Sequence, residues 1–327
     1  MLTNVVAAAV AVSVIIPAYN AGPELEELLG RLFAQSLPPL EVIVIDSSSQ
    51  DGTAERARRS GARVFEIPQS EFDHGGTRNR AAGFAAGEVL VFLTQDAMPA
   101  DDRLLEKLVQ PLRDPWVACA YGRQLPREDA TVLEKLSRDF NYPAASSVKD
   151  KSDLERLGIK TFFCSNVCSA VRRETFVDLG RFDEPVIFNE DLFFAAKAVQ
   201  AGYRIAYAAE AKVVHSHNYS AAQQFRRFFD NGVSMRNNAW VYAYSSVNKE
   251  GSRLVRTQMK ALARGRKWRW VVKLVVESAA KYAGYQLGKR YDRLPYALRV
   301  RFSMHRAIWG KLQAGGGGGG KGTAVRG

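Results

Sequence analysis

Residues 12–17 read V-S-V-I-I-P and residues 41–46 read E-V-I-V-I-D, and these two apolar runs decide the fold. Both are short and rich in β-branched residues, which predicts strands that are buried on both faces. A helix follows the first run, because four leucines share one helical face: Leu25, Leu28, Leu29 and Leu32. A polar loop and a helix over residues 53–60 follow the second run.

The same order of strand, loop and helix continues along the chain. A third short strand is expected over residues 64–67, a helix of small residues over 76–87, and a fourth buried strand over 89–93. This alternation predicts an α/β fold with a Rossmann-like, mostly parallel sheet that helices cover on both faces. Such sheets bind ligands beyond the carboxyl ends of their strands. The residues at those ends are Tyr19 and Asn20, then Asp46, then Asp96.

The composition changes in the second half of the chain. We predict one domain over residues 1–220, a basic helical extension over 221–313, and a disordered glycine-rich tail over 314–327. No apolar stretch, including residues 5–12, is long enough to span a bilayer, so we expect a soluble or peripheral protein.

Charge and cysteine content restrict the partners and the compartment. The formal charge of +12 and the pI near 9.7 suit nucleic acid, an anionic membrane or a phosphorylated substrate, and charge alone does not choose among them. Three cysteines without zinc-ligand spacing disfavour a disulfide framework and favour a reducing compartment.

Two strand-end aspartates are candidate ligands for a nucleotide. Asp46 could accept a hydrogen bond from the imide N–H of uracil or thymine, while Ser49 or Asp51 caps the next helix. Asp96 offers the hard oxygen that a divalent cation on a diphosphate requires.

Residues 72–79 read F-D-H-G-G-T-R-N and precede the helix of small residues. The two glycines permit a close backbone approach, and Arg78 could pair with a phosphate. The alternative is a tight loop that only introduces the helix.

Glu190 and Asp191 open a predicted helix over residues 189–201. The helix dipole favours acids there, yet a carboxylate in a cleft could also deprotonate an acceptor hydroxyl. His215 and His217, in V-V-H-S-H, should lie on one face of a strand, as metal or phosphate ligands or as a polar strand end.

Five motifs in this order resemble inverting, A-type glycosyltransferases of family 2, and within them the bacterial rhamnosyltransferases. They lie between Val12 and Asn218, about two thirds of the chain, and read V-S-V-I-I-P-A-Y-N, V-I-V-I-D-S-S-S-Q-D-G-T, F-D-H-G-G-T-R-N, V-F-L-T-Q-D-A and F-N-E-D-L-F-F-A. The third motif and T-Q-D-A look particularly like the rhamnosyltransferase branch.

The resemblance implies a role for each candidate residue. Asp191 would be the general base and Glu190 would help to position the acceptor. Asp96 would hold Mg²⁺ or Mn²⁺, completed by His215 or His217. The implied nucleotide-binding residues are Pro17, Tyr19, Asn20, Asp46, Arg78 and Gln95.

The sequence departs from the family pattern at two places. The usual D-x-D motif is T-Q-D here, with Thr94 in place of the first acid, so fewer carboxylates would hold the metal. The Q-x-x-R-W motif of processive relatives is absent after Tyr219, and Q-F-R-R-F at residues 224–228 only loosely matches it. The absence of this second motif favours transfer of one or a few sugars over polymerisation.

The resemblance therefore implies transfer of L-rhamnose from dTDP-L-rhamnose to a surface glycan or a lipid-linked acceptor, on the cytoplasmic side of a bacterial-type membrane. A UDP-hexose donor and a non-catalytic sugar-nucleotide-binding protein are the alternatives. The basic extension could contact anionic lipid through Trp268, Trp270 and Trp309, or could pack on the catalytic domain. Nucleic acid is disfavoured, because no reading motif accompanies the basic residues and carboxylates mark each sheet edge.

Overall fold

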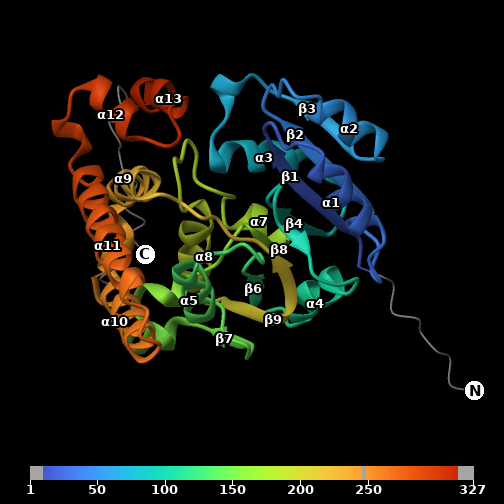
Figure 1. Cartoon of the computed structure of the whole chain (residues 1–327). Coiled ribbons are helices and arrows are strands. Elements are labelled where there is room, and N and C mark those ends of the chain that lie inside the picture. The colour runs from blue at the N-terminus through green and yellow to red at the C-terminus, as the bar shows by residue number, and fades with distance from the viewer. Residues whose placement is uncertain (1–9, 245–247, 316–327) are drawn as a thin grey trace, which may run out of the picture.

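The computed structural model describes residues 10–244 and 248–315, and its centre is a nine-stranded sheet (Figure 1). Four parallel neighbours form its first half in the order β3-β2-β1-β4. Their bounds are Val12–Ala18 for β1, Glu41–Asp46 for β2, Arg63–Glu66 for β3 and Val89–Leu93 for β4. The four predicted strands and their parallel pairing are confirmed.

The second half of the sheet is mixed. Strand β8 (Cys168–Arg172) pairs antiparallel with both β4 and β6 (Val117–Leu125), and β9 (Arg204–Val214) runs parallel to β6. The short strands β5 (Met98–Pro99) and β7 (Ser147–Lys149) pair antiparallel with β9. As a result, the carboxyl ends of β4, β6 and β9 and the amino end of β8 share one edge.

Helices cover both faces of the sheet. Successive residues of β1 enter opposite cores, Ile15 on one side and Val14 and Ile16 on the other, as the two-residue period of a strand requires. One core also holds buried residues of α1 (Glu24–Phe33), α2 (Thr53–Arg59) and α4 (Leu104–Val109). The other holds those of α3 (His74–Phe84), α7 (Arg173–Asp178) and α8 (Glu190–Gln200).

Shorter elements connect these layers. The helices are α5 (Val132–Asn141) and α6 (Leu154–Leu157). The 3₁₀ turns are Gln69–Glu71, Gln110–Arg113, Lys151–Asp153, Gly158–Phe162, Ala239–Ala243 and Tyr291–Arg293. The helix predicted over residues 76–87 begins earlier, at His74, because the Asp73 side chain accepts a hydrogen bond from the Gly76 N–H at 2.6 Å.

The C-terminal extension is helical, as predicted, and its helices lie along one side of the sheet (Figure 1). They are α9 (Ala221–Asn237), α10 (Asn248–Arg264), α11 (Trp268–Gly288), α12 (Tyr296–Phe302) and α13 (Ile308–Gly315). Phe229 and Trp309 form a small core with Ile187, which precedes α8. No helix among the described residues is long and apolar enough to cross a bilayer.

The structure describes the tryptophans of the predicted extension and only the start of the predicted tail. Trp309 is buried and Trp270 is half-buried in a cluster with Leu262 and Leu274, so for these two rings the structure favours the alternative of packing over lipid contact. Of the three tryptophans considered for lipid contact, only Trp268 is exposed. The tail predicted over 314–327 lies outside the described residues from residue 316 onward.

Helices α9 and α11 make close contact through three glycines. A Cβ on Gly284 would lie 2.2 Å from the Phe225 carbonyl oxygen, and one on Gly288 would lie 2.1 Å from that of Phe229. From the α9 side, a Cβ on Gly232 would lie 2.4 Å from the Tyr285 carbonyl oxygen. The two backbones can therefore approach only because no side chain lies between them.

We expect Gly284→Ala to lower the free energy of unfolding by about 1–3 kcal/mol, because the added methyl group has no space between α9 and α11. Urea titration followed by circular dichroism measures it. Gly30→Ala on the exposed face of α1 is the matched control. Nothing lies within 4 Å of its Cβ, so helix propensity should leave stability equal or raise it by about 0.5–1 kcal/mol. Equal stability of Gly284→Ala and the wild-type protein would contradict the packing argument.

Candidate active site

The predicted site residues come together at one sheet edge, the edge at which β4, β6 and β9 end. Asp96 follows β4, and His215 and His217 follow β9. Because β8 is antiparallel, the residues that precede it also lie at this edge, and the Thr94 N–H donates to the Val167 carbonyl at 3.2 Å. Strand direction therefore places residues far apart in sequence at one edge of the sheet.

Asp96, His215 and His217 form a cluster that could hold a metal ion, their ligand atoms all lying within 4.8 Å of one another. Oδ2 of Asp96 lies 3.5 Å from Nε2 of His215 and 3.2 Å from Nε2 of His217. Nδ1 of His215 lies 3.1 Å from Oε1 of Gln124, so a proton on Nδ1 would leave Nε2 free to coordinate.

The electrostatics of this cluster suit a cation. Burial opposes ionisation of Asp96, but His215 and His217 hold the pKa of its carboxyl well below the usual range. Burial, followed by the charge of His215, lowers the pKa of His217 to about 4, so its imidazole is neutral at neutral pH. A carboxylate with two imidazoles is a donor set that fits Mn²⁺.

The prediction that both histidines lie on a strand is wrong in detail. Strand β9 ends at Val214, and the chain beyond it is irregular up to the start of α9 at Ala221. The His215 N–H still donates to the Leu125 carbonyl at 2.9 Å, whereas the Ser216 side chain turns to accept from the Arg127 N–H at 3.0 Å. The rings nevertheless meet, because both bend toward Asp96.

Hydrogen bonds and an ion pair hold the two acids that begin α8, Glu190 and Asp191. The backbone N–H groups of Asn166 and Leu192 donate to Asp191, at 3.0 and 2.8 Å. The side-chain amide of the same Asn166 donates to Glu190 at 3.0 Å, and Arg78 pairs with Glu190 at 3.3 Å. One asparagine thus orients both carboxylates.

The surroundings of Asp191 raise the pKa of its carboxyl. Burial, together with the adjacent charge of Glu190, raises the pKa of Asp191 to about 7. Asp191 is half-buried and not fully enclosed. A carboxylate with a pKa near neutrality is matched to abstracting a proton from a hydroxyl group.

Much of the F-D-H-G-G-T-R-N motif contacts the chain's own loop before α8. A Cβ on Gly75 would lie 2.0 Å from the Asp183 carbonyl oxygen, so the close approach that the glycines permit is made by this loop. Asn79 donates to the Phe182 carbonyl at 2.9 Å and to Glu184 at 3.0 Å. The motif therefore fixes the segment that leads into Glu190 and Asp191.

Arg78 lies in this buried wall. It pairs with Glu190 and donates to the His74 carbonyl at 2.9 Å. The structure thus brings Arg78 to the two acids, and its contact with a nucleotide base or phosphate stays a prediction.

The predicted nucleotide residues form the adjoining part of the edge. Gln95 is bonded twice to the backbone of Tyr19, whose N–H donates to Oε1 at 2.7 Å and whose carbonyl accepts from Nε2 at 3.2 Å. Asn20, at φ +45°, donates from its backbone to Ser49 at 2.8 Å. Pro17 lies in β1 just before them. These contacts join the loops after β1, β2 and β4.

Asp46 is almost completely buried under this surface. Its carboxylate accepts hydrogen bonds from the backbone N–H and the hydroxyl of Ser49, at 2.9 and 2.5 Å. Ser49 in turn holds Asn20, so Asp46 fixes the shape of the loop, and its predicted contact with a pyrimidine remains a prediction. Asp51 accepts from the Thr53 N–H at 3.1 Å, but the N-cap position of α2 is Gly52, so the expectation that Ser49 or Asp51 occupies it is wrong.

Two polar residues at the site were not predicted from the sequence. Asn166 lies in S-N-V-C, where nothing in the local pattern marks a functional side chain. The side-chain oxygen of Gln124 lies beside Nδ1 of His215, and its side-chain N–H donates to the Tyr142 hydroxyl at 2.6 Å. Both were identifiable only once the pairing of β8 and β6 was known.

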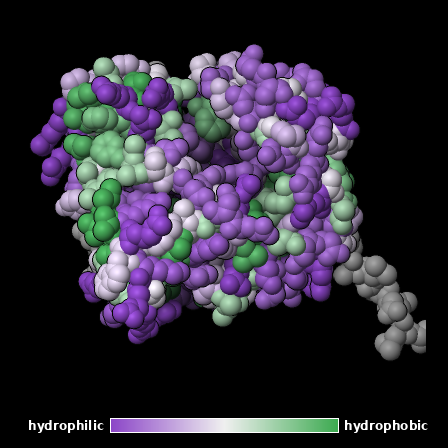
Figure 2. Space-filling model, in the orientation of Figure 1, coloured by the Kyte–Doolittle hydropathy of each residue, from purple (hydrophilic) through white to green (hydrophobic). Residues whose placement is uncertain are grey.

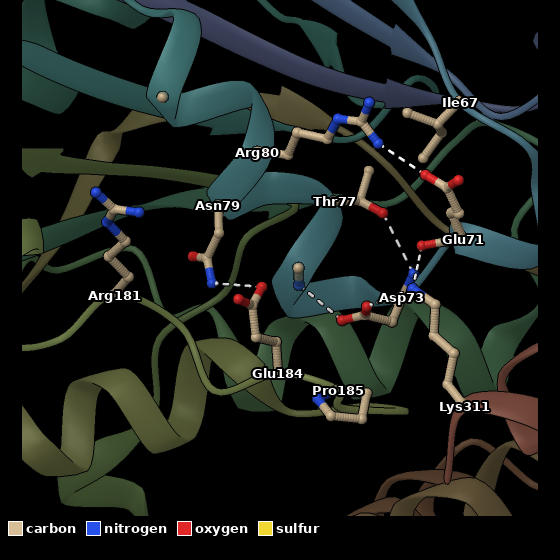
Figure 3. Close-up of a pocket in the computed structure, with 12 residues that line it drawn as sticks. Ile67, Glu71, Asp73, Thr77, Asn79, Arg80, Arg181, Glu184, Pro185 and Lys311 are labelled. Atoms are coloured by element: carbon tan, nitrogen blue, oxygen red, sulfur yellow. Dashed lines mark hydrogen bonds and ion pairs between the residues drawn. The ribbon is translucent and has the colours of Figure 1, made fainter. Parts of the chain in front are cut away.

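A separate cavity of about 660 Å³ lies beside the first turn of α3 and contains none of the predicted catalytic or metal residues (Figure 3). Its charged groups pair with one another: Arg80 with Glu71 at 2.8 Å, and Lys311 of α13 with Asp73 at 2.9 Å. Figure 3 shows Lys311 reaching toward the start of α3. This cavity lies between the extension and the sheet unit, apart from the predicted catalytic and metal-binding residues.

Known proteins are similar to this chain in sequence and in fold. The sequence profile of glycosyl transferase family 2 matches residues 13–180. O-antigen chain rhamnosyltransferase RfbN of Salmonella typhimurium is 41% identical over 305 residues, covering 92% of this chain and 97% of the relative. WbaN of Salmonella anatum, with the same description, is 41% identical over 304 residues, covering 92% of this chain and 96% of its own.

Two solved structures resemble the fold at low sequence identity. Mannosyltransferase PcManGT of Pyrobaculum calidifontis, in complex with GDP-Man and Mn²⁺, has a TM-score of 0.60 at 22% identity and covers 87% of this chain and 88% of its own. TarS 1-349 of S. aureus has a TM-score of 0.53 at 18% identity, covering 94% and 92%. The predicted A-type fold is confirmed, and by profile and by near full-length relatives the chain belongs to glycosyl transferase family 2.

Proposed function

We propose that this protein is an inverting rhamnosyltransferase that moves L-rhamnose from dTDP-L-rhamnose to a hydroxyl of a growing O-antigen-type glycan. The observation that carries the proposal is the half-buried Asp191, whose pKa lies near 7, at the same sheet edge as the Asp96, His215 and His217 cluster. Two relatives described as O-antigen chain rhamnosyltransferases, each 41% identical, support the sugar and the type of acceptor.

Asp191 would act as the general base in a single displacement. It takes the proton of the acceptor hydroxyl, whose oxygen then forms a bond to the anomeric carbon as the bond from that carbon to the diphosphate oxygen breaks. Attack from the opposite face inverts the configuration. Asn166 keeps the Asp191 carboxylate oriented, and Glu190, neutralised by Arg78, supports the acceptor side.

Asp96, His215 and His217 would hold the divalent metal ion. When bound, the ion supplies positive charge that stabilises the departing nucleoside diphosphate. Two imidazoles beside one carboxylate favour Mn²⁺ over Mg²⁺, because Mg²⁺ prefers all-oxygen coordination and retains its water. Thr94 stands where the family pattern has its first acid, and its buried side chain helps to lower the pKa of the Asp96 carboxyl.

The nucleotide would lie across the loops that Gln95 and Ser49 join, against Pro17, Tyr19 and Asn20. The exposed ring of Tyr19 offers a flat apolar surface to a pyrimidine. Asp46 would accept a hydrogen bond from the imide N–H of the base. Uracil and thymine share this group, so a UDP-hexose is the alternative donor.

The acceptor would be a lipid-linked glycan at the inner face of the cell membrane. The protein would then be cytoplasmic, in peripheral contact with anionic lipid, and its excess of 46 Lys and Arg over 34 Asp and Glu suits such a surface.

The donor assignment is tested by incubating the purified protein with a panel of nucleotide sugars and Mn²⁺ and measuring nucleoside diphosphate release. We expect slow hydrolysis of dTDP-L-rhamnose above that of UDP-glucose, UDP-galactose and GDP-mannose. A thermal shift with dTDP and Mn²⁺ but not with DNA should accompany it. Selective release from a UDP-hexose would replace the proposed donor. No release from any donor, together with no nucleotide-induced shift, would argue for a different function.

Asp191→Asn should lower kcat by roughly 10²–10⁴-fold, because the amide cannot accept the proton. In the wild-type protein, kcat should fall as the pH drops below about 7, where Asp191 becomes protonated. Initial rates from pH 5.5 to 9 measure both effects. Asp178→Asn, at an exposed carboxylate on α7, should change neither.

The stability of Asp191→Asn distinguishes a loss of catalysis from a loss of folding. Asp191 has a higher pKa when folded, about 7, than the ordinary value of 3.8 for an aspartate, so the folded state binds the proton more tightly and ionisation costs stability as the pH rises from about 4 to 7. Asp191→Asn removes this cost and should be no less stable than the wild-type protein at pH 8. A folded Asp191→Asn variant with near wild-type turnover would exclude Asp191 as the base.

Removing the metal ligands should weaken Mn²⁺ binding directly. We expect Asp96→Ala and His217→Ala each to raise the Kd for Mn²⁺ at least tenfold by calorimetry or electron paramagnetic resonance, and EDTA to abolish donor hydrolysis until Mn²⁺ is restored. Asp102→Ala, at an exposed acid outside the cluster, is the control. Unchanged Mn²⁺ affinity in both ligand variants would place the metal elsewhere.

A further inference from the structure

The outward side of α11 carries an apolar strip that no other part of the described chain covers. Its members are between 51% and 68% exposed, and we call them the α11 outer face: Trp268, Val272, Val275, Val276 and Tyr282. At 3.6 residues per turn their five positions fall within an arc of about 120°, so they share one side of the helix. Figure 2 shows hydrophobic residues gathered over α11 at the left of the molecule.

The packing of α11 on α9 determines which side faces outward. Gly284 and Gly288 are buried against the α9 backbone, and Leu274 is buried toward α10 and α5. Rotation of α11 about its axis would break these contacts and is therefore disfavoured. The outer face is thus presented in a fixed orientation and does not belong to the core of the protein.

The charge around the outer face has one sign. Residues 251–291 contain eleven lysines and arginines and one acid, Glu277, which is buried and lies 3.7 Å from Lys273. Exposed cations lie at both ends of α11: Arg264, Arg266, Lys267 and Arg269 at its start, and Arg290 and Arg293 beyond its end. Asp292, near the second group, is paired with Arg236 at 3.7 Å.

We propose that the α11 outer face lies on the surface of an anionic lipid bilayer, with its valines and Trp268 at the boundary of headgroups and acyl chains. At about 1.5 Å per residue, the 21 residues of α11 lie for roughly 30 Å along the surface. The cations at both ends then face lipid phosphates. The inference rests on the proposed function in one respect, since a lipid-linked acceptor would be presented at this surface.

Charge favours lipid over a second copy of the chain. Two outer faces in contact would bring one basic end against another basic end in either relative direction, and like charges repel. An anionic bilayer has the opposite charge along its whole surface. The aromatic residues near the two ends, Trp268 and Tyr282, are of the type enriched where a membrane meets water.

Co-sedimentation of the full-length protein with vesicles tests the inference without donor, metal or acceptor. We expect binding to phosphatidylcholine vesicles that contain 30% phosphatidylglycerol, little binding to pure phosphatidylcholine, and weaker binding as salt rises. Equal binding to both compositions, or none to either, would overturn it. The rhamnosyl-transfer assay on a water-soluble acceptor is independent, so failure of one proposal leaves the other intact.

Matched variants locate the binding surface. Arg269→Glu should weaken partitioning to anionic vesicles by on the order of 25-fold, from about fivefold for each unit of charge. Arg59→Glu, which makes the same charge change at an exposed arginine of α2, should have little effect. The double variant Val272→Ser and Val276→Ser should weaken partitioning about tenfold. Its control is Val148→Ser with Val177→Ser, at valines 55% and 48% exposed on other elements.

Three outcomes would contradict the assignment to the α11 outer face. If the controls lose as much binding as the test variants, the surface lies elsewhere. If only Arg269→Glu loses binding, the valines do not enter the boundary. If sedimentation velocity shows a dimer that the Val272 and Val276 variant dissociates, the occupant of the face is a second copy.

Discussion

The antiparallel pairing of β8 between β4 and β6 is the constraint on which the active site depends. Its backbone hydrogen bonds align the start of β8 with the end of β4, so that Asn166 arrives at the edge where Asp96 and the two histidines lie. A parallel β8 would carry Asn166 to the opposite edge. Asp191 and Glu190 would then lose the amide that orients both of them.

Burial of charge around α8 links the fold to the chemistry. Arg78 and Glu190 are an ion pair out of contact with water, and breaking such a pair leaves an uncompensated charge. The same Glu190 and the same burial raise the pKa of Asp191 to about 7. The arrangement thus lowers the stability of the fold and provides a carboxylate that can take up a proton at neutral pH.

The helical extension belongs to this arrangement as well. Lys311 of α13 pairs with Asp73, which caps α3, and Nε2 of His305 lies 3.3 Å from Nε2 of His74, one turn before Arg78. The wall behind Glu190 and Asp191 is therefore closed by residues that lie 238 and 231 positions from their partners Asp73 and His74 in sequence. Contacts of α9 and α11 through glycine backbones hold the extension that supplies them.

The sequence by itself determined the four parallel strands, the helices between them and the strand-end positions of Asp46 and Asp96, because period and β-branching are local properties. The motifs also indicated Asp191 and the histidines. Only the tertiary structure decided that Arg78 pairs with Glu190, that Asn166 and Gln124 belong to the site, and that Trp309 is buried whereas Trp268 is exposed. These depend on strand direction and helix rotation, which are set by contacts between residues distant in sequence and leave no local pattern.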